Sequence, residues 1–305
     1  MARRLSILLA ACVLALLPCA GICRAQAPQM PEAVVSPYAA DDFAAAMRVL
    51  APLKGRPLSE AMVACAEHFK GTPYVAGTLE GETEALLVDT RRTDCILFVE
   101  MCLAITVASR SDSPDFERYC GILRSLRYRD GRVDGYASRL HYTSEWLHQA
   151  ENLGYLFDIT GRVGGERLQQ RFFFMSKHPK SYRQLAAAQE GDSLAMSQLE
   201  CIKAAEERLD EGRYFLLRQE NIAANADRIQ SGDIISFNST VPGLDIAHVG
   251  IALREGDTLT FIHASSVQGK VVISSEPLVD YVIGRKDVDG IRVARLRTCL
   301  NFIEK

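Results

Sequence analysis

The chain has 305 residues, of which 48% are hydrophobic and 24% charged, and its formal net charge is −3. This length and composition are typical of a globular protein with a sizeable core, arranged as one large domain or two. The acidic balance argues against a nucleic-acid partner, because nucleic-acid-binding proteins usually carry a surplus of basic side chains.

The first 27 residues have the three-part layout of a secretory signal. Arg3 and Arg4 precede an apolar stretch of 13 residues, Leu5 to Leu17, and a small-residue region ends at Ala25-Gln26-Ala27. A permanent membrane anchor is disfavoured, since a spanning helix needs about 20 apolar residues. We therefore expect export to the periplasm, with secretion as the second choice, and one mature domain over residues 28–305. Cleavage would remove three arginines and no acidic residue, which moves the net charge from −3 to −6.

The mature chain would keep six cysteines: Cys65, Cys95, Cys102, Cys120, Cys201 and Cys299. Pairing is the default in an oxidising compartment. Cys95 and Cys102, however, lie in apolar helical sequence, without the closely spaced and turn-rich pattern of a disulfide scaffold. We expect mostly buried free thiols and predict no particular pair.

Hydrophobic spacing and turn residues predict mainly helices up to residue 225 and strands after it. The helices are expected over residues 41–50, 57–69, 94–108 and 194–209, with short strands near 155–163 and 214–218. The last 75 residues hold short β-branched runs at 233–237, 247–253, 258–262, 271–274 and 291–296. Turn signals such as Pro242-Gly243 separate these runs, which predicts an antiparallel meander. Helices followed by such strands indicate an α+β fold.

Cys95 falls at the start of the predicted helix 94–108, where Asp94 suits the N-cap position. Unpaired N–H groups and the helix dipole at such a position are expected to lower the pKa of a thiol. Cys95 is therefore a candidate nucleophile. The alternative is a buried core cysteine, which is the commonest state of a free thiol.

Two histidines lie on the predicted strands 247–253 and 258–262 or just after them, His248 and His263. Adjacent antiparallel strands can bring them side by side, with His248 as the base and His263 holding the imidazole in the useful tautomer. Each histidine could instead be a satisfied core residue. A zinc site of Cys95, His248 and His263 is weaker, because no Cys-x-x-Cys or His-x-x-x-His spacing supports it. We expect neither a metal nor an organic cofactor.

Five fragments in order resemble the signature of the NlpC-type papain-like cell-wall cysteine peptidases. They are Gly71-Thr72-Pro73-Tyr74, Thr93-Asp94-Cys95, Gly232-Asp233-Ile234-Ile235, His248-Val249-Gly250-Ile251 and Ile262-His263-Ala264. The resemblance implies a papain-like core, in which the Cys95 helix packs on the C-terminal sheet. It also implies a site tyrosine, Tyr74, whose hydroxyl faces the developing oxyanion. Tyr74 could equally be a packed loop aromatic.

Cys95 and His248 are 153 residues apart, which leaves room for a large helical insertion at about residues 109–225. With this insertion, and with Ser138 to Tyr142 and Gly243 to His248, the chain resembles the N-acetylmuramoyl-L-alanine amidase-like subfamily. That resemblance implies cleavage between muramic acid and L-alanine in soluble peptidoglycan fragments, the muropeptides.

A substrate clamp is expected at Arg139, His141 and Tyr142, which offer a cation, an imidazole and a phenol in one turn-like run. The alternative is a solvated loop.

Three other functions remain open at this point. A γ-D-glutamyl endopeptidase of the same superfamily would cut within the stem peptide and needs the same triad. A thiol acyltransferase would transfer the acyl group to an amine rather than to water. A non-enzymatic peptidoglycan-binding module would not need the set of Cys95, His248 and His263. The oligomeric state does not follow from the sequence.

Overall fold

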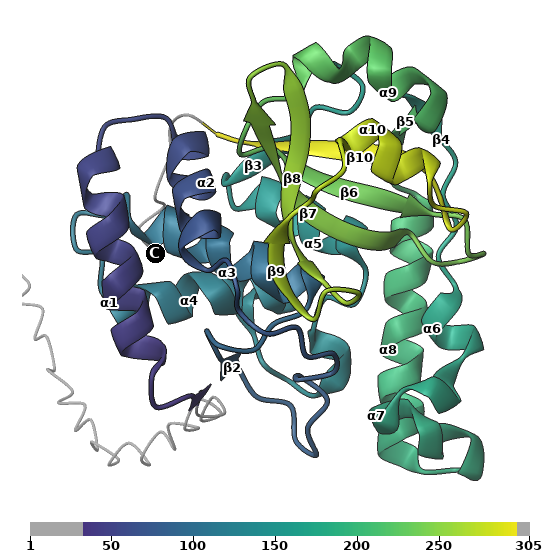
Figure 1. Cartoon of the computed structure of the whole chain (residues 1–305). Coiled ribbons are helices and arrows are strands. Elements are labelled where there is room, and N and C mark those ends of the chain that lie inside the picture. The colour runs from purple at the N-terminus through teal and green to yellow at the C-terminus, as the bar shows by residue number, and fades with distance from the viewer. Residues whose placement is uncertain (1–32, 298–305) are drawn as a thin grey trace, which may run out of the picture. The chain divides into compact units, whose positions relative to one another are not determined.

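A computed structural model of the chain describes residues 33–297. The predicted secretory signal, residues 1–27, and Cys299 lie outside the described residues. Within residues 33–297, no helix combines the length and the apolar content that crossing a membrane requires. Figure 1 shows the described part, coloured from the N-terminal helices to the last strand.

An antiparallel sheet forms the centre of the described structure. Its strands are β3 (Leu156–Asp158), β4 (Glu166–Leu168), β5 (Tyr214–Arg218), β6 (Ile234–Ser239), β7 (Ile246–Glu255), β8 (Thr258–Ser265), β9 (Lys270–Ile273) and β10 (Val288–Leu296). The order is β4-β5-β10-β6-β7-β8-β9, and β3 also pairs with β10. A separate two-stranded parallel ladder joins β1 (Val34–Val35) to β2 (Leu87–Val88).

The α-helices are α1 (Ala39–Leu50), α2 (Leu58–His68), α3 (Cys95–Ala108), α4 (Phe116–Arg127), α5 (Thr143–Asn152), α6 (Phe174–Lys177), α7 (Arg183–Ala186), α8 (Ser193–Asp210), α9 (Gln219–Asn225) and α10 (Leu278–Ile283). Short 3-10 turns lie at Ala51–Leu53, Arg129–Gly131, Tyr136–Ser138, Pro179–Ser181, Ala187–Glu190 and Ala226–Arg228.

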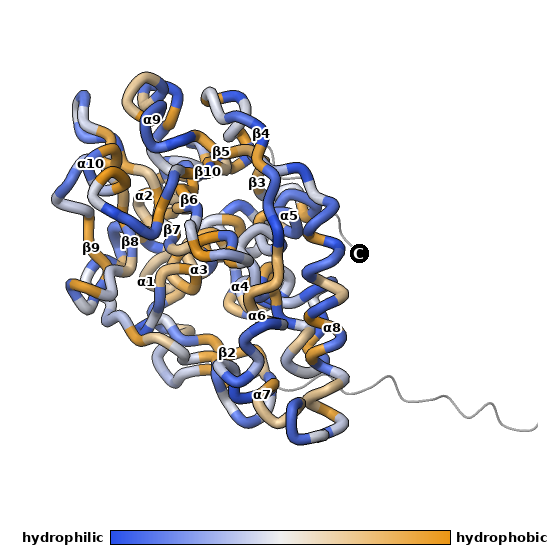
Figure 2. Tube along the Cα trace, turned by 90° about the vertical axis from the view of Figure 1, so that its right-hand side faces the viewer, coloured by the Kyte–Doolittle hydropathy of each residue, from blue (hydrophilic) through white to orange (hydrophobic). Residues whose placement is uncertain are grey.

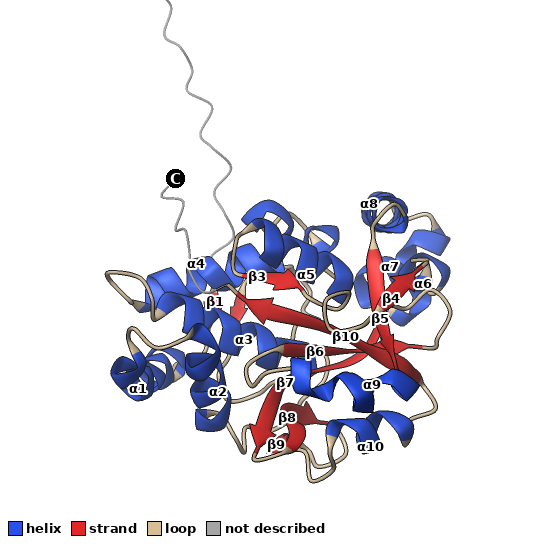
Figure 3. Ribbon diagram, turned by 90° about the horizontal axis from the view of Figure 1, so that it is seen from above, coloured by secondary structure: helices blue, strands red, loops and turns tan. Residues whose placement is uncertain are grey.

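The helices cover both faces of the sheet (Figure 3). On one face, side chains of α1 to α5 pack with Val249, Ile251 and Ile262 of β7 and β8. On the other, α9 and α10 pack with Phe237 and Phe261 of β6 and β8. Each strand can serve two cores because alternate side chains point to opposite faces. The result is a mixed α+β fold.

A third apolar cluster joins α6, α7 and α8 through residues such as Met175, Leu185 and Ile202. Blue and orange segments alternate along α8, whereas α3 is largely orange (Figure 2). This alternation fits a surface helix with one buried face.

The predicted elements are largely confirmed. The helices around Cys95 and at 194–209 are present as α3 and α8, and strand 214–218 has the bounds of β5. The prediction of a simple meander was wrong for the last strand. Strands β6 to β9 follow one another, but β10 returns to pair with β6, Ile291 opposite Phe237. This places a buried strand, β10, in the middle of the sheet, which a run of short strands in sequence does not reveal.

Candidate active site

Cys95 is the first residue of α3, and the side chain of Asp94 caps that helix. Asp94 is in an extended conformation, and its Oδ1 accepts a hydrogen bond from the N–H of Leu97 at 2.9 Å. An N-cap carboxylate satisfies one of the orphan donors of the first turn, which fixes where the helix begins. The predicted N-cap is therefore confirmed, and Cys95 stands at the helix start.

Helix α3 is fixed by burial on almost every side. Residues Phe98 to Ala108 are all buried, including one acid, Glu100. The carboxylate of Glu100 lies 2.7 Å from the Arg127 guanidinium and accepts a hydrogen bond from Trp146 Nε1 at 3.2 Å. A helix that is apolar all round is held by packing from all directions, so the position of Cys95 is set by the core.

Tyr74 is brought to the same helix start by backbone pairing. Tyr74 forms an isolated β-bridge with Thr93, the second residue before Cys95. The neighbouring Val75 N–H donates a hydrogen bond to the Thr93 carbonyl at 2.8 Å. On the other side, the Tyr74 N–H donates to the Gly269 carbonyl beside β9 at 2.9 Å. Burial raises the pKa of the Tyr74 phenol, and the charges of Cys95 and Asp94 add to that shift. Tyr74 and Cys95 therefore share one site.

His248 and His263 form a hydrogen-bonded pair. His248 Nε2 lies 2.7 Å from His263 Nδ1, and the two rings meet edge to face with centroids 4.9 Å apart. The register of β7 and β8 makes this possible, since Ile251 pairs with Ile262 and the paired part of the two strands ends there. His263 is buried and His248 half-buried.

The Cys95 thiol lies beside β7, next to His248 in the sequence of that strand. The backbone N–H of Val249, the residue after His248, faces the Cys95 sulfur and favours its thiolate. Cys95, His248, His263 and Tyr74 are thus brought together from four segments: the α3 start, β7, β8 and the loop before β2.

The expected low thiol pKa is not what the structure gives. Burial and, after it, the neighbouring Asp94 carboxylate raise the pKa of Cys95 to about 12, against the smaller effect of the backbone N–H groups. The sequence prediction weighed the helix N-terminus alone and missed burial and the adjacent acid. The resting thiol is therefore neutral at pH 7.

The histidines are neutral as well. Burial lowers the pKa of His248 to about 3, with further contributions from His263 and Arg285. Burial also lowers the pKa of His263 to about 4, and Arg285 again acts in the same direction. A neutral imidazole keeps a free lone pair, which is the form that general-base catalysis uses.

Sequence reasoning missed three residues of this site, Tyr281, Arg285 and Asp287. The Tyr281 ring on α10 lies 5.8 Å from the His263 ring and 6.4 Å from the His248 ring, centroid to centroid. Arg285 is bound to Asp287 through two hydrogen bonds, Nε at 3.0 Å and Nη2 at 2.5 Å. No motif marks these residues, because only the fold brings α10 beside the histidine strands.

The predicted clamp residues are already engaged by protein partners. The Arg139 guanidinium is 4% exposed and lies 2.7 Å from Glu80 and 3.7 Å from Glu84. The Tyr142 hydroxyl is buried and donates to Glu206 at 2.7 Å. These contacts account for Arg139 and Tyr142 without a substrate, and the alternative of a solvated loop does not fit either residue.

His141 is occupied in the same way. Its Nε2 lies 2.9 Å from the Tyr136 carbonyl, and its ring lies 4.4 Å from the Tyr136 ring. Burial lowers the pKa of His141 to about 3, and the Arg139 charge adds to the shift. The structure does not bring Arg139, His141 or Tyr142 into contact with Cys95 or the histidine pair.

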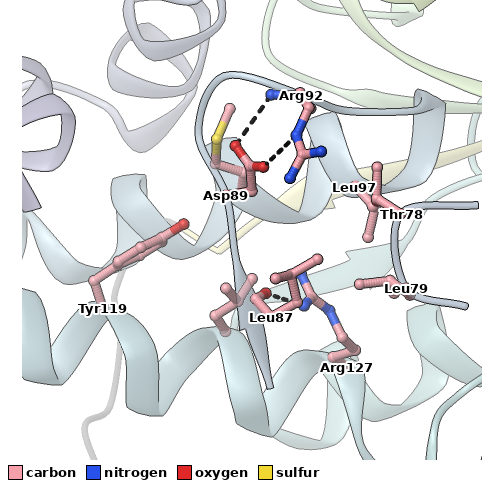
Figure 4. A pocket seen from close by; sticks show the side chains of 10 residues that line it. Thr78, Leu79, Leu87, Asp89, Arg92, Leu97, Tyr119 and Arg127 are labelled. Carbon is pink, nitrogen blue, oxygen red and sulfur yellow. Dashed lines mark hydrogen bonds and ion pairs between the residues drawn. The ribbon is translucent and has the colours of Figure 1, made fainter. Parts of the chain in front are cut away.

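A small cavity lies behind the first turns of α3 (Figure 4). It has a volume of about 10 Å³ and is lined by Leu97, Tyr119 and Arg127 among others. That space holds about one water molecule, so it is not a substrate site. A hollow of about 420 Å³ lies against loop 240–244, which leads into β7. Neither is lined by Cys95, His248 or His263, and no cluster of three metal-ligating side chains occurs within residues 33–297.

The family of the chain follows from comparison with known sequences. Residues 64–291 match the family model described as AmiA-like, N-acetylmuramoyl-L-alanine amidase-like. The chain belongs to this family. The matched range contains every member of the candidate site, from Tyr74 to Asp287.

The chain is also similar to solved structures over most of its length. An N-acetylmuramoyl-L-alanine amidase from Bacteroides uniformis is 33% identical, with a TM-score of 0.72, over 79% of this chain and 99% of its own. A proposed xylanase from Bacteroides fragilis is 34% identical, with a TM-score of 0.70, over 76% of this chain and 99% of its own. A Legionella pneumophila protein shares the fold at 20% identity and a TM-score of 0.60, over 84% and 94%. No protein of the curated set matches the chain.

Proposed function

We propose that this amidase-like protein is a cysteine amidase that hydrolyses the amide bond between N-acetylmuramic acid and L-alanine in muropeptides. The observation that carries the proposal is the His248 Nε2 to His263 Nδ1 hydrogen bond of 2.7 Å beside Cys95 at the start of α3. A nucleophile, a base and an orienting group are the parts that acyl transfer requires, and Cys95 lies beside Val249, the residue that follows His248.

The base role fixes one tautomer of His248. If His248 Nε2 carries the hydrogen and donates it to His263 Nδ1, then His248 Nδ1 keeps a lone pair. That lone pair takes the Cys95 proton as the sulfur attacks the amide carbonyl carbon. The starting state is a neutral thiol and a neutral imidazole, so the proton moves as the bond forms.

The tetrahedral intermediate then breaks its C–N bond. The imidazolium of His248 gives its proton to the leaving nitrogen, which departs as the free amine of the peptide, and the muramoyl group remains on Cys95 as a thioester. A water molecule loses a proton to the same imidazole, attacks the thioester, and the C–S bond breaks. The proton returns to sulfur, and the muramic acid leaves with a free carboxyl group.

The oxyanion is stabilised from the helix start. The Cys95 N–H belongs to the first turn of α3 and has no partner within the helix. The Tyr74 hydroxyl, tied to the same place by the Tyr74 to Thr93 bridge, supplies a second donor. Such preorganised donors contribute a large share of the rate enhancement in acyl transfer.

The proposal extends to architecture and location. We propose that helix α3, packed on β7 and β8, is the nucleophile helix of a papain-like core, and that residues 109–225 are an insertion into it. We also propose that the chain is exported, which the signal-like sequence of residues 1–27 supports. An exported enzyme would meet muropeptides in the periplasm.

The test is mass spectrometry of a purified disaccharide stem peptide after incubation with the mature protein. Release of free disaccharide and of a peptide beginning with L-alanine is expected. Cys95→Ala should release neither. Cys201→Ala serves as the matched control, because Cys201 is an exposed cysteine on α8, and it should behave as the unchanged protein.

Each other outcome identifies a different function. Cuts within the peptide would assign a γ-D-glutamyl endopeptidase, and a new amide formed with added amine would assign an acyltransferase. Binding without any product would leave a peptidoglycan-binding protein. Cleavage of a xylan would favour the activity named for the Bacteroides fragilis relative. That activity normally needs two free carboxylates at the site, whereas Asp94 is committed to its helix cap.

A further inference from the structure

Tyr281 stands beside the histidine pair, and it packs in the apolar cluster of α9 and α10, whereas Tyr74 packs in the cluster of α3. Its ring packs against Phe261 at 4.8 Å and Phe237 at 5.2 Å, and it approaches the His263 ring edge-on. Burial raises the pKa of the Tyr281 phenol, and Cys95 is among the charges that act on it. The Tyr281 ring therefore borders both histidines.

The hydroxyl of Tyr281 has an unused donor. Its oxygen accepts a hydrogen bond from Arg285 Nη1 at 3.0 Å. Among the described residues, no acceptor takes the hydroxyl hydrogen, and Tyr281 is only half-buried. Asp287 holds Arg285 by two hydrogen bonds, so the direction of the Arg285 to Tyr281 contact is fixed. A hydroxyl that accepts from a cation is polarised and donates more strongly.

The chemistry of the proposed reaction decides which part of a substrate lies there. The proton on His248 must pass to the leaving nitrogen, so the leaving group lies against the imidazole. Tyr74, by contrast, is tied to the helix start, where the oxyanion forms. Tyr281 borders the imidazoles from the apolar cluster of α9 and α10 and not from that of Tyr74, so its place fits the leaving group.

We propose that Tyr281 is a substrate-binding residue for the leaving group, and that its hydroxyl donates a hydrogen bond to the carbonyl oxygen of the first residue of the departing peptide. Arg285 is the positioning residue that holds this hydroxyl. The inference rests on the proposed function. It makes the site selective for amides whose amine part is an amino acid or a peptide rather than a simple alkylamine.

Two substrates with the same disaccharide can show whether Tyr281 binds the departing peptide or only packs against the histidines. One carries the stem peptide, and in the other the amide nitrogen carries an isopropyl group, which keeps the branching of alanine but has no carbonyl. Tyr281→Phe keeps the ring that packs on His263 and removes only the hydroxyl. Tyr155→Phe is the matched control, since Tyr155 is also half-buried but lies before β3.

Steady-state kinetics on both substrates give the answer. For the peptide substrate, Tyr281→Phe should raise KM and lower kcat/KM about tenfold, as expected for one hydrogen bond to a neutral acceptor. For the isopropyl amide, the loss should be at least fivefold smaller. Tyr155→Phe should show the same small change on both.

Equal losses on the two substrates would overturn the assignment, because a residue that only supports the histidines affects every substrate alike. A loss confined to kcat on both would do the same. If the unchanged protein cleaves neither amide, the proposed function itself fails and the role of Tyr281 falls with it. Turnover by the unchanged protein with equal losses in the variant rejects the Tyr281 assignment alone.

Discussion

Asp94 caps the helix that presents Cys95, and the same carboxylate opposes ionisation of the Cys95 thiol. One oxygen is bonded to the Leu97 N–H, which holds the helix start in place. The negative charge adjacent to the sulfur, together with burial, keeps the pKa of the thiol at about 12. The residue that positions Cys95 at the helix start therefore also favours the protonated form of its thiol.

Replacing Asp94 by Asn tests this double role. Asn caps helices about as well as Asp, so α3 should keep its start while the negative charge is lost. The pKa of Cys95 should fall, and alkylation of Cys95 by iodoacetamide at pH 8 should become faster. The rate is measured by mass spectrometry of the Cys95 peptide, with exposed Cys201 as the internal reference.

In the unchanged protein, the alkylation rate of Cys95 should rise about tenfold per pH unit between pH 7 and 9. This slope follows because the thiolate fraction grows tenfold per unit below the pKa. A rate that is already level at pH 6 would show a resting thiolate and would contradict the neutral thiol.

Arg285 should set the acidic limit of activity. Burial lowers the pKa of His248 and His263 to about 3 and about 4, and the Arg285 charge contributes to both shifts. The base works only when neutral, so kcat/KM should stay level from pH 8 down to about pH 5. Arg285→Gln removes a positive charge that opposes protonation, which raises both histidine pKa values. The acidic limb of the kcat/KM profile should move to higher pH.

The control is Arg56→Gln, which removes an equally positive charge from an exposed pair with Glu60. Its profile should overlay that of the unchanged protein. An acidic limb for Arg285→Gln that stays in place or moves to lower pH would show that Arg285 does not act on the histidines.

The parts of the site that local sequence determines were predictable. The Asp94 cap, the Cys95 helix and the two strands with His248 and His263 depend on patterns within a few residues of each other. The sequence showed that the two histidines could lie side by side, but it could not predict the hydrogen bond between them, because that bond depends on the register of β7 and β8. That register is set by which side chains the two cores bury on each face of the sheet.

The parts that depend on tertiary contact were not predictable. Tyr281 reaches the histidines because α10 packs on the face of the sheet opposite α3, and no motif near Tyr281 indicates this. Arg139 and Tyr142 looked like a polar run in a loop, but their partners Glu80 and Glu206 lie 59 and 64 residues away in the chain. Burial of the thiol, which reverses the expected pKa shift, is likewise a property of the assembled core.

We expect His263 to support catalysis by accepting a hydrogen bond from His248 at its Nδ1 atom. In the proposed tautomer its Nδ1 accepts the His248 N–H at 2.7 Å. His263→Ala removes this acceptor and leaves a gap in a buried place, so kcat should fall by about 100-fold or more. His263→Asn offers an amide oxygen as acceptor and should recover a substantial part of the loss.

Both His263 variants must remain folded, which near-ultraviolet circular dichroism and the thermal midpoint would show. Equal kcat values for the Ala and Asn variants, with both folded, would mean that His263 fills space and does not orient His248. A kcat near that of the unchanged protein for His263→Ala would remove His263 from the catalytic set.

The buried pair of Glu100 and Arg127 should govern stability rather than chemistry. Burial raises the pKa of Glu100, and Arg127 and Trp146 oppose that rise through charge and hydrogen bonds. Glu100→Ala leaves the Arg127 guanidinium buried without its carboxylate, which should lower the free energy of unfolding by about 3–5 kcal/mol. Replacing both residues by apolar ones should lower the free energy of unfolding less than this single change, because no buried charge is left unpaired.

Urea unfolding followed by tryptophan fluorescence measures the stability of both variants. The exposed Glu60→Ala is the control, and its stability should change little. A single variant as stable as the unchanged protein would show that water or another acid reaches Arg127, and that the core around α3 is looser than the contacts of Glu100 indicate.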